Sequence, residues 1–336
     1  MKVVMTLTAR NEADLIDEMI AFHLAIGVDF VIAADNESND GTTEVLETYV
    51  QDGYAELIRV PDPFRQIELV TEMARRAATD HGADWVINSD ADEFWWPRGG
   101  SLKEILAAVP AKYGSVRGMW RNFAPRPETD GSFAERMTVR SQQPVDDLHP
   151  FNTHFKSVHR ASPDVEVGGG NHDVVGTGVT PLPGWYPLDV LHFPIRSYEQ
   201  FERKFLRHYD VTSGGTGNAT NPFYNRIRDA HRDGRLRDLY DEFVVDDASL
   251  AARVADGTLA EDTRLRDALR SLQRDPPRID LGASAVDSGY LVELGYLEEH
   301  TPLSRAQKRT EGLEDRLSHV EQHVHVRLAR KLRSLG

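Results

Sequence analysis

Cysteine is absent from all 336 residues of this chain. Disulfide bonds, thiolate zinc sites and cysteine nucleophiles are therefore excluded. Long apolar runs are also missing, because the longest one, residues 19–34, is interrupted by His23, Gly27 and Asp29. A segment of that kind does not span a bilayer. The first eight residues turn polar too early for a signal peptide, so the sequence predicts a cytoplasmic protein.

Basic residues are fewer than acidic residues. The chain has 39 lysine and arginine residues against 54 aspartate and glutamate residues, which gives a formal net charge of -15. A surface of that sign argues against nucleic acid as a partner, because phosphate backbones attract basic surfaces. The hydrophobic content of 40% is sufficient for one large domain with an appendage.

Strand and helix patterns alternate through the first part of the chain. Strands are expected at residues 3–8, 30–34, 55–60 and 85–88, with helices at residues 12–26, 43–49 and 66–81. Alternation at this spacing predicts βαβ units around a parallel sheet. After Pro97 the pattern indicates a mixed sheet with long loops. Its expected elements are a helix at 102–109, strands at 115–122 and near 154–159, and a strand ending at His192.

The C-terminal part is mostly helical in pattern, with a helix at residues 198–209 and further helices within residues 221–244. Residues 304–335 carry one apolar stripe with spacings of mostly three and four. Its members are Leu313, Leu317, Val320, Val324, Leu328, Leu332 and Leu335. Residues 325–333 are basic, which suits contact with an anionic membrane. A coiled-coil dimer and a plain capping helix are equally compatible with the stripe.

Two aspartates at the end of the fourth expected strand are the most informative feature. Asp90 and Asp92 are two residues apart, so an extended chain places them on the same side, at the exposed end of the strand. Ligands bind at this edge of an open α/β sheet. Carboxylate oxygens together with substrate phosphates are common ligands of Mg²⁺ or Mn²⁺. A solvated acidic turn is the alternative interpretation.

Polar segments also follow the first and second strands. The loop of residues 8–12 precedes a helix and suits an anionic or nucleotide ligand. Helix capping by Asn11, with Glu12 near the helix N-terminus, explains the same residues without a ligand. Asp35 ends the second strand, where its carboxylate can accept a hydrogen bond from a base or ribose. Residues 38–42 are as well explained by a turn, with Gly41 supplying a positive φ.

In this order and spacing, the three segments Thr8–Glu12, Asp35–Thr42 and Asn88–Phe94 resemble the motifs of the family 2-type glycosyltransferases. The similarity is greatest to the subgroup whose metal motif reads Asp-x-Asp-Glu-Phe. The resemblance covers about residues 1–210 and is strong over residues 1–95. It implies a GT-A fold, which is an α/β Rossmann-like mixed sheet, with a helical C-terminal region.

The resemblance also implies a division of the chain. A GT-A domain would occupy residues 1–210, with a nucleotide-sugar-binding half at 1–95 and an acceptor half at 96–210. A helical extension would follow at residues 211–300, and an amphipathic helix at residues 301–336. The implied reaction is an inverting transfer of a sugar from a UDP-sugar or another nucleotide-diphosphate donor. The acceptor would be a hydroxyl of a glycan or a lipid-linked molecule, in polysaccharide or glycolipid assembly.

Residue roles are part of the same implication. The nucleoside contacts fall on Thr8, Ala9, Arg10, Glu12 and Asp35. The divalent metal, Mn²⁺ or Mg²⁺, falls on Asp90 and Asp92, with Asp92 as the direct ligand and Asp90 closer to the ribose. His192, which ends a late apolar strand, resembles the C-terminal metal-binding histidine of several GT-A enzymes. A buried hydrogen-bonded histidine is the other interpretation of His192.

The base is assigned less directly. An inverting transfer needs a group that takes the acceptor hydroxyl proton. The Glu-Asp motif that family 2 enzymes use is absent, and residues 168–173 read Gly-Gly-Gly-Asn-His-Asp. Three glycines let the backbone approach a ligand closely. Asp173 is the first choice for the base and His172 the alternative, while a polar turn without chemistry also explains the segment.

Several other side chains have two interpretations. Trp95, Trp96 and Trp120 suit stacking on sugar rings or packing in the core. Arg196, Arg203 and Lys204 suit pairing with a phosphate or a solvated helix face. The whole pattern also admits a metal-dependent nucleotidyltransferase, although the loop at residues 8–12 lacks the glycines of such enzymes. A non-catalytic sugar-binding or nucleotide-binding protein on the same fold is the third class, and the intact aspartate pair argues against it.

Overall fold

The computed structural model describes residues 1–61, 65–142, 155–183, 185–213, 222–279 and 281. All of them belong to one compact unit, Met1–Ala285. Among these residues no helix is long and apolar enough to cross a membrane. The predicted amphipathic helix at residues 301–336, with its stripe at 304–335, lies outside the described residues.

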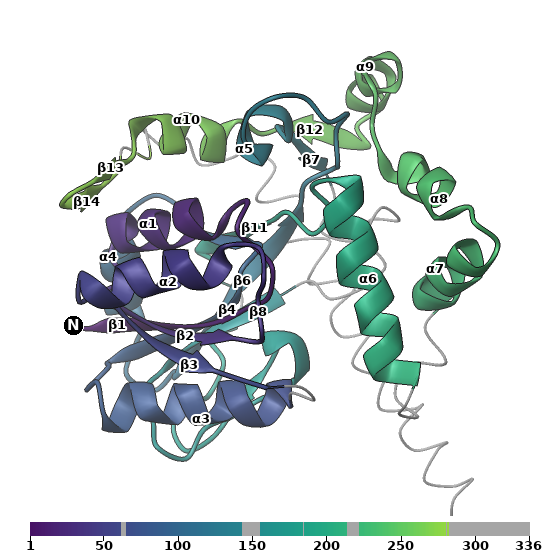
Figure 1. Ribbon diagram of the computed structural model, residues 1–336. Coiled ribbons are helices and arrows are strands. Elements are labelled where there is room, and N and C mark those ends of the chain that lie inside the picture. The colour runs from purple at the N-terminus through teal and green to yellow at the C-terminus, as the bar shows by residue number, and fades with distance from the viewer. Residues whose placement is uncertain (62–64, 143–154, 184, 214–221, 280, 282–336) are drawn as a thin grey trace, which may run out of the picture. The chain divides into compact units, whose positions relative to one another are not determined.

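An eight-stranded mixed sheet organises this unit, in the order β3-β2-β1-β4-β8-β6-β11-β5 (Figure 1). Its strands are β1 Val3–Ala9, β2 Phe30–Asp35, β3 Ala55–Arg59, β4 Trp85–Asp90, β5 Glu93–Pro97, β6 Ser115–Asn122, β8 Phe155–Arg160 and β11 Leu188–His192. Strands β3, β2, β1 and β4 are parallel, as predicted. Strand β8 then runs antiparallel between β4 and β6. The predicted α/β class with a Rossmann-like mixed sheet is confirmed.

Ten α-helices are described. They are α1 Ile16–Ile26, α2 Thr42–Gln51, α3 Gln66–Thr79, α4 Leu102–Ala108, α5 Phe133–Arg136, α6 Tyr198–Ser213, α7 Pro222–Arg232, α8 Leu236–Phe243, α9 Asp247–Ala255 and α10 Arg264–Ser271. The short elements are β7 Val139–Ser141, β9 Glu166–Val167, the 3-10 turn η1 Gly169–Asn171, β10 Val174–Val175, β12 Leu259–Glu261, β13 Gln273–Arg274 and β14 Pro277–Arg278.

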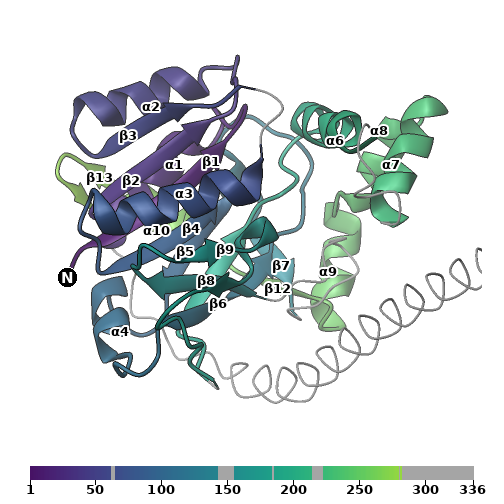
Figure 2. The same ribbon diagram turned by 90° about the horizontal axis from the view of Figure 1, so that it is seen from below.

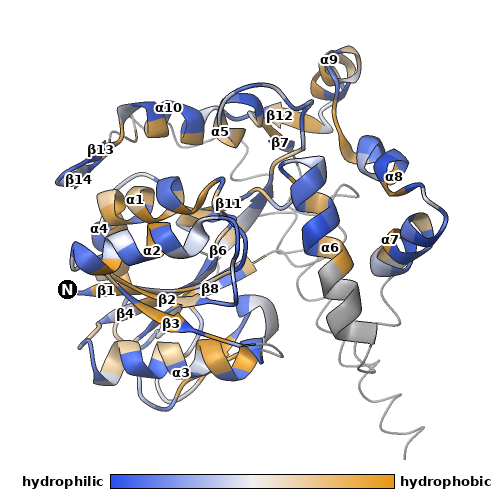
Figure 3. Ribbon diagram, in the orientation of Figure 1, coloured by the Kyte–Doolittle hydropathy of each residue, from blue (hydrophilic) through white to orange (hydrophobic). Residues whose placement is uncertain are grey.

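The sheet is covered on both faces because side chains alternate along each strand. Val3, Met5 and Leu7 of β1 belong to the apolar cluster that includes the buried side chains of α1 and α4. Val4 belongs to a second cluster with Val70 of α3 and with the β9–β10 hairpin. Figure 2 shows α3 crossing the opposite face, and Figure 3 shows the strongly hydrophobic parallel strands between the helices. A parallel half buried in this way needs near-continuous apolar strands.

Local sequence explains where several helices begin and end. Gly27 ends α1 in the left-handed region, with φ 115, where a residue with a Cβ is strained. Ser101 and Glu104 form a capping box at the start of α4. Helices α6, α7 and α8 bury a separate aromatic cluster that includes Phe201, Phe223 and Tyr240. This cluster explains the aromatic periodicity that predicted α6.

The sequence did not predict β5. Its residues directly follow the acidic motif, where the sequence indicated no further strand. In the structure β5 is fully buried and pairs antiparallel with β11, with Glu93 opposite His192. Trp95 and Trp96 therefore lie in the core, with 0% and 1% exposure, so the packing interpretation of these two side chains holds.

A buried aspartate connects the C-terminal extension to the sheet. Asp189 of β11 is fully buried and lies 3.0 Å from Nε of both Arg98 and Arg121, and 2.9 Å from Nη1 of Arg264. Burial alone would raise the pKa of Asp189, but the three guanidinium groups hold it well below its usual range. Since Arg264 also pairs with Asp262, the β12–α10 segment is held by charge as well as by packing.

A buried histidine makes the stability dependent on pH. His23 of α1 is fully buried, with Nδ1 2.7 Å from the carbonyl of Met19 and Nε2 accepting from the Trp95 N–H. Burial lowers its pKa to about 4 from 6.5. Between these values the unfolded chain binds more protons, so the stability from neutral His23 is complete above pH 6.5 and is lost as the pH falls toward 4.

We expect His23 to contribute a loss of about 2 kcal/mol in the free energy of unfolding between pH 7 and pH 5. Urea unfolding at both pH values measures this loss. The His23→Gln variant should show a smaller difference between the two pH values. The control His231→Gln, at an exposed position of α7, should keep the full difference. Equal pH dependence in all three proteins would contradict the role of His23.

Candidate functional site

The candidate site lies at the carboxyl ends of β1, β2 and β4. In the strand register Thr8 is opposite both Ala34 and Asp90, and Ala9 is opposite Asp35. The three segments that the sequence singled out therefore meet at one edge of the sheet. This is the edge at which open parallel sheets bind ligands.

The loop after β1 is built against the turn after β2. Asn11, with φ 54, donates its backbone N–H to Ser38 Oγ at 2.9 Å and accepts from the Asn39 N–H at 2.8 Å. Glu12 N–H donates to Thr42 Oγ1 at 2.8 Å. The turn residues 38–42 thus have the structural role that the turn interpretation gave them, and they fix the path of residues 10–13.

Asp35 is buried, with 2% exposure, at the end of β2. Its carboxylate accepts from the Ser38 N–H at 3.1 Å and from the Thr43 hydroxyl. Arg59 Nη1 lies 3.9 Å from the same carboxylate. Arg10 reaches the neighbouring Asn36 Oδ1 at 3.2 Å. The carboxylate of Asp35 is therefore held in one orientation by its own turn.

Asp90 and Glu93 share one lysine. Lys156 of β8 is 1% exposed, and its Nζ lies 2.8 Å from Asp90 Oδ2 and 2.8 Å from Glu93 Oε1. Burial raises the pKa of Glu93 to about 7, against the effect of the Lys156 ammonium. Burial alone would lower the pKa of Lys156, but the two carboxylates raise it above its usual value. Asn171 of η1 donates to the other oxygen of Asp90 at 3.2 Å.

Asp92 has a different cation. Lys204 of α6 places Nζ 2.5 Å from Asp92 Oδ2, and His192 Nε2 lies 3.7 Å from the same oxygen. Burial alone would raise the pKa of Asp92, but the Lys204 ammonium lowers this pKa well below its usual range. Asp92 is 3% exposed, whereas the Lys204 side chain is 35% exposed. The two aspartates of the motif are thus neutralised by lysines from two different elements.

A buried arginine just before α6 pairs with carboxylates of the loop after β1. Arg196 is fully buried, and its guanidinium pairs with Glu12 and, at 2.6 Å, with Asp14. It also donates to the carbonyl of Phe193 at 3.0 Å. Beside it, Arg203 donates to the carbonyl of Asn11 at 3.0 Å. For Arg196 and Lys204 the solvated-face interpretation is wrong, because both are bound to carboxylates of the site.

The side chains near Asp92 are compatible with one divalent cation. Two metal–ligand bonds of about 2.1 Å span up to about 4.2 Å, so a cation fits between Asp92 Oδ2 and His192 Nε2. Asn122 Oδ1 lies 2.8 Å from His192 Nδ1, which places the proton on Nδ1 and the lone pair on Nε2. In the described part of the chain no group of three or more His, Cys, Asp or Glu side chains is arranged for a metal. The remaining ligands would be phosphate and water oxygens, as is usual for Mg²⁺.

Trp120 lies between the two lysine–carboxylate pairs. Its ring stacks on His192 at 4.3 Å, and its Nε1–H donates to Glu93 Oε1 at 2.9 Å. Lys156 Nζ lies 5.2 Å from the ring centre. At 4% exposure Trp120 orients the histidine and offers little surface to a sugar.

The glycine-rich loop carries the two candidate bases and contacts this edge through Asn171. His172 Nδ1 lies 2.9 Å from the carbonyl of Phe155, and burial, with Lys156 nearby, lowers the pKa of His172 to about 4. Asp173 is 75% exposed and lies 3.5 Å from Arg117 Nη2. Lys156 Nζ also donates to the carbonyl of Gly170 at 2.6 Å. The loop is therefore attached to the Asp90 carboxylate through both Asn171 and Lys156.

The lysine partners of the aspartates were not predicted from the sequence. Lys156 follows β-strand alternation, but nothing local indicates that its ammonium lies at Asp90. Lys204 is 112 residues from Asp92, and only the packing of α6 brings the two together. The sole available signal was the surplus of carboxylates at one sheet edge, which requires cations when it is buried.

Comparison with known families identifies the family of this chain. The model described as glycosyltransferase family 92 matches residues 4–177, just over half of the 336 residues. The chain belongs to glycosyltransferase family 92. The motifs alone indicate family 2-type enzymes, so the resemblance is confirmed at the level of a glycosyltransferase. The predicted fold class is confirmed with it.

A family 92 protein from Oryza sativa subsp. japonica is 29% identical over 123 residues. That match covers 36% of this chain and 21% of the rice protein, so the chain spans about a fifth of the length of that relative. Among solved structures, residues 1–349 of S. aureus TarS give a TM-score of 0.35 at 11% identity, covering 63% of this chain and 66% of TarS.

Glucosyl-3-phosphoglycerate synthase from Mycobacterium tuberculosis, solved with Mn²⁺, UDP and phosphoglyceric acid, is a further similar structure. It gives a TM-score of 0.27 at 18% identity and covers 48% of this chain and 56% of that one.

Removing the Arg196 guanidinium should destabilise the protein strongly. Glu12 would be left buried without its cation, and we expect Arg196→Ala to lower the free energy of unfolding by about 3–5 kcal/mol. Urea unfolding measures the loss. As a control, Arg226→Ala removes an exposed partner of Glu242 and should cost less than about 1 kcal/mol. Similar losses in both variants would contradict a buried ion pair at Arg196.

Proposed function

We propose that this family 92 chain is a glycosyltransferase that moves a sugar from a nucleotide-diphosphate donor, with UDP first among the nucleotides, to an acceptor hydroxyl. The observation that supports this most is the meeting of Thr8, Asp35 and Asp90 at the carboxyl ends of three parallel strands. A nucleotide placed there would lie between the loop of residues 8–12 and the Asp-x-Asp pair.

The nucleoside end of the site is assigned to the first two strands. The nucleoside would lie against the loop of Thr8, Ala9 and Arg10. Glu12 would hold this loop in place through its ion pair with Arg196. Asp35 would accept from the base or ribose with the oxygen orientation that Ser38 fixes. Asp90 would lie at the ribose side of the metal.

The diphosphate end is assigned to Asp92, His192 and Lys204. A bound Mn²⁺ or Mg²⁺ would supply Lewis-acid stabilisation of charge on the leaving diphosphate. Asp92 and His192 are the protein ligands that would hold it. Lys204 now neutralises Asp92 at 2.5 Å, and with a third of its side chain exposed it can turn toward a phosphate oxygen instead. That exchange keeps the local charge balanced when the donor enters.

The acceptor proton is assigned to Asp173. Its carboxylate is exposed and lies on the loop that contacts Asp90, whereas His172 is a weak base because burial lowers its pKa to about 4. Attack by the acceptor hydroxyl from this side would invert the configuration at the sugar carbon. His172 remains the alternative base.

The setting of the reaction is part of the proposal. A cytoplasmic enzyme acting in polysaccharide or glycolipid assembly suits the acidic composition and the basic stretch at residues 325–333. The alternative activity, a nucleotidyltransferase, is disfavoured because the loop after β1 contains no glycine. A non-catalytic binding protein on this fold would bind nucleotide without turning it over.

Metal-dependent nucleotide binding is the central test. Calorimetric titration of UDP and of GDP, each with Mn²⁺ or with EDTA, should show binding of one nucleotide with Mn²⁺ and at least about tenfold weaker binding with EDTA. Asp92→Ala should abolish the metal dependence because it removes the direct ligand.

The matched control is Asp247→Ala, which removes an exposed aspartate of α9 and should leave the titration unchanged. Failure of a folded protein to bind either nucleotide would overturn the UDP and GDP versions of the proposal. Binding that is equal with Mn²⁺ and EDTA would remove the metal from it.

The base assignment predicts a loss of turnover without a loss of donor binding. Asp173→Asn should lower the kcat of sugar transfer by about 100-fold or more, because general base catalysis typically contributes 10²–10⁴. His172→Gln should lower it much less. Nucleotide affinity should stay the same in both variants. A larger effect at His172 would reverse the assignment of the base.

A further inference from the structure

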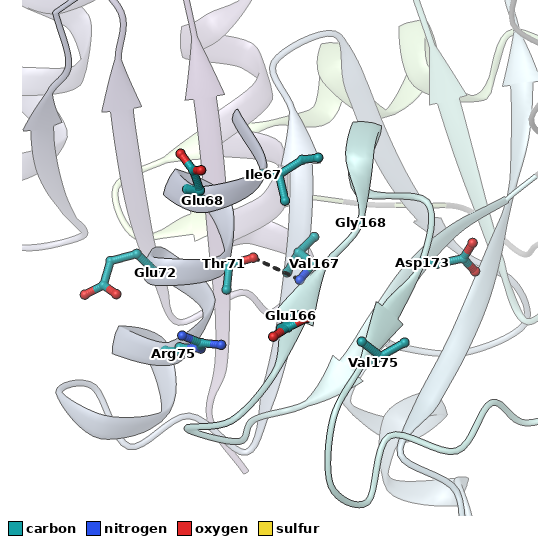
Figure 4. Close-up of a pocket in the computed structure, with 10 residues that line it drawn as sticks. All are labelled: Ile67, Glu68, Thr71, Glu72, Arg75, Glu166, Val167, Gly168, Asp173 and Val175. Carbon is teal, nitrogen blue, oxygen red and sulfur yellow. Dashed lines mark hydrogen bonds between the residues drawn. The ribbon is translucent and has the colours of Figure 1, made fainter. Parts of the chain in front are cut away.

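A cavity of about 480 Å³ lies between α3 and the β9–β10 hairpin (Figure 4). Thr71 and Val167 form its floor. The Val167 N–H donates a hydrogen bond to Thr71 Oγ1 at 3.0 Å. Both floor residues are buried. The volume is in the range of small-molecule sites, roughly 300–1,000 Å³. The donor site described above makes no use of this cavity.

Two exposed apolar side chains form part of its walls. Ile67 of α3 is 53% exposed and Val175 of β10 is 60% exposed, the two highest values among the large hydrophobic side chains of the described residues. A Cβ placed on Gly169 would lie 3.7 Å from Ile67 Cδ1, so the glycine backbone is close to that wall. Apolar surface in a hollow of this size can pack against the apolar face of a ligand.

Carboxylates surround the apolar part. Glu68 and Glu72 lie on the α3 side in Figure 4, with Asp173 on the opposite side. Glu166 completes the set of four. Arg75 also lines the cavity and donates to the carbonyl of Val165 at 2.8 Å, and Arg117 lies 3.5 Å from Asp173. Glu68 is paired with Arg65 at 3.2 Å. Carboxylate oxygens accept hydrogen bonds from hydroxyl groups and repel phosphate and carboxylate groups.

One short loop contributes residues both to the cavity and to the candidate site. Gly168 and Asp173 line the cavity, while Asn171 of the same loop donates to Asp90 at 3.2 Å. The Gly168 N–H donates to the Asp173 carbonyl at 2.7 Å, which closes the loop into a tight unit. A ligand in the cavity would therefore lie beside the residue assigned as the base.

We infer that the cavity between α3 and the β9–β10 hairpin is the acceptor subsite, and that it takes an uncharged oligosaccharide. This inference rests on the proposed glycosyltransferase function and names the acceptor class for it. The aliphatic faces of sugar rings pack on Ile67 and Val175, and the surrounding carboxylates accept from sugar hydroxyls. The same carboxylates exclude acceptors that carry phosphate or uronic acid groups.

Binding of defined trisaccharides to the full chain tests the inference. Cellotriose, maltotriose and chitotriose are the neutral probes, and trigalacturonic acid is the anionic probe, each titrated calorimetrically with UDP and Mn²⁺ present. We expect saturable binding of at least one neutral probe and none of the anionic probe. Val175→Trp fills the cavity and should weaken the neutral probe at least tenfold. Val254→Trp, a matched change on α9, should leave it unchanged.

Charge reversal gives an independent readout. The double variant with Glu72→Lys and Glu166→Lys should bind trigalacturonic acid at least tenfold more tightly than the unchanged protein. Absence of binding for all neutral probes, equal affinity in Val175→Trp, or preference of the unchanged protein for the anionic probe would each overturn the inference. UDP binding, measured on the same samples, separates the two proposals. If UDP still binds when the trisaccharide results fail, only the acceptor subsite is contradicted. If UDP binding is also lost, the proposed donor site is contradicted.

Discussion

Burial of carboxylates at one edge of the sheet is the constraint on which the rest of this structure depends. Glu12, Asp92 and Glu93 are at most 9% exposed, and a buried charge without a partner costs several kcal/mol. Each carboxylate therefore has a cation: Arg196 for Glu12, Lys204 for Asp92 and Lys156 for Glu93. Arg196 lies in the loop after β11, Lys204 in α6 and Lys156 in β8. Charge pairing thus determines which later segments must return to the β1–β4 edge.

The same pairing supports the proposed binding of a charged donor. Lys156 is fixed between two carboxylates and a backbone carbonyl, so it acts as a permanent part of the wall. Lys204 pairs with Asp92 and has a partly exposed side chain, so in the proposed mechanism it is the cation that changes partners. His192 is oriented by Asn122 and by the Trp120 ring. Fixed side chains beside one adjustable cation are consistent with the proposed binding and release of a diphosphate.

The sequence predicted those features that local patterns encode. Alternating strands and helices gave the parallel half, and the strand ends located Thr8, Asp35 and Asp90 at one edge. Strand β5 was not predicted, because an acidic motif followed by tryptophans does not resemble a strand until β11 pairs with it. The partners Lys156 and Lys204 were unpredictable for the same reason, since tertiary packing alone brings them to the aspartates. The cavity beside Asp173 also depends on two elements distant in sequence.

Strand β11 has a consequence for the boundaries of the protein. It lies between β6 and β5 in the sheet, and it leads directly into Arg196 and α6. The stretch matched by the family model ends at residue 177, before β11, Arg196 and α6. A fragment cut at that point would leave two neighbouring strands without their shared partner and Glu12 without a counter-ion. The unit that is recognisable by sequence is therefore smaller than the unit that can fold, and expression trials should extend past α6.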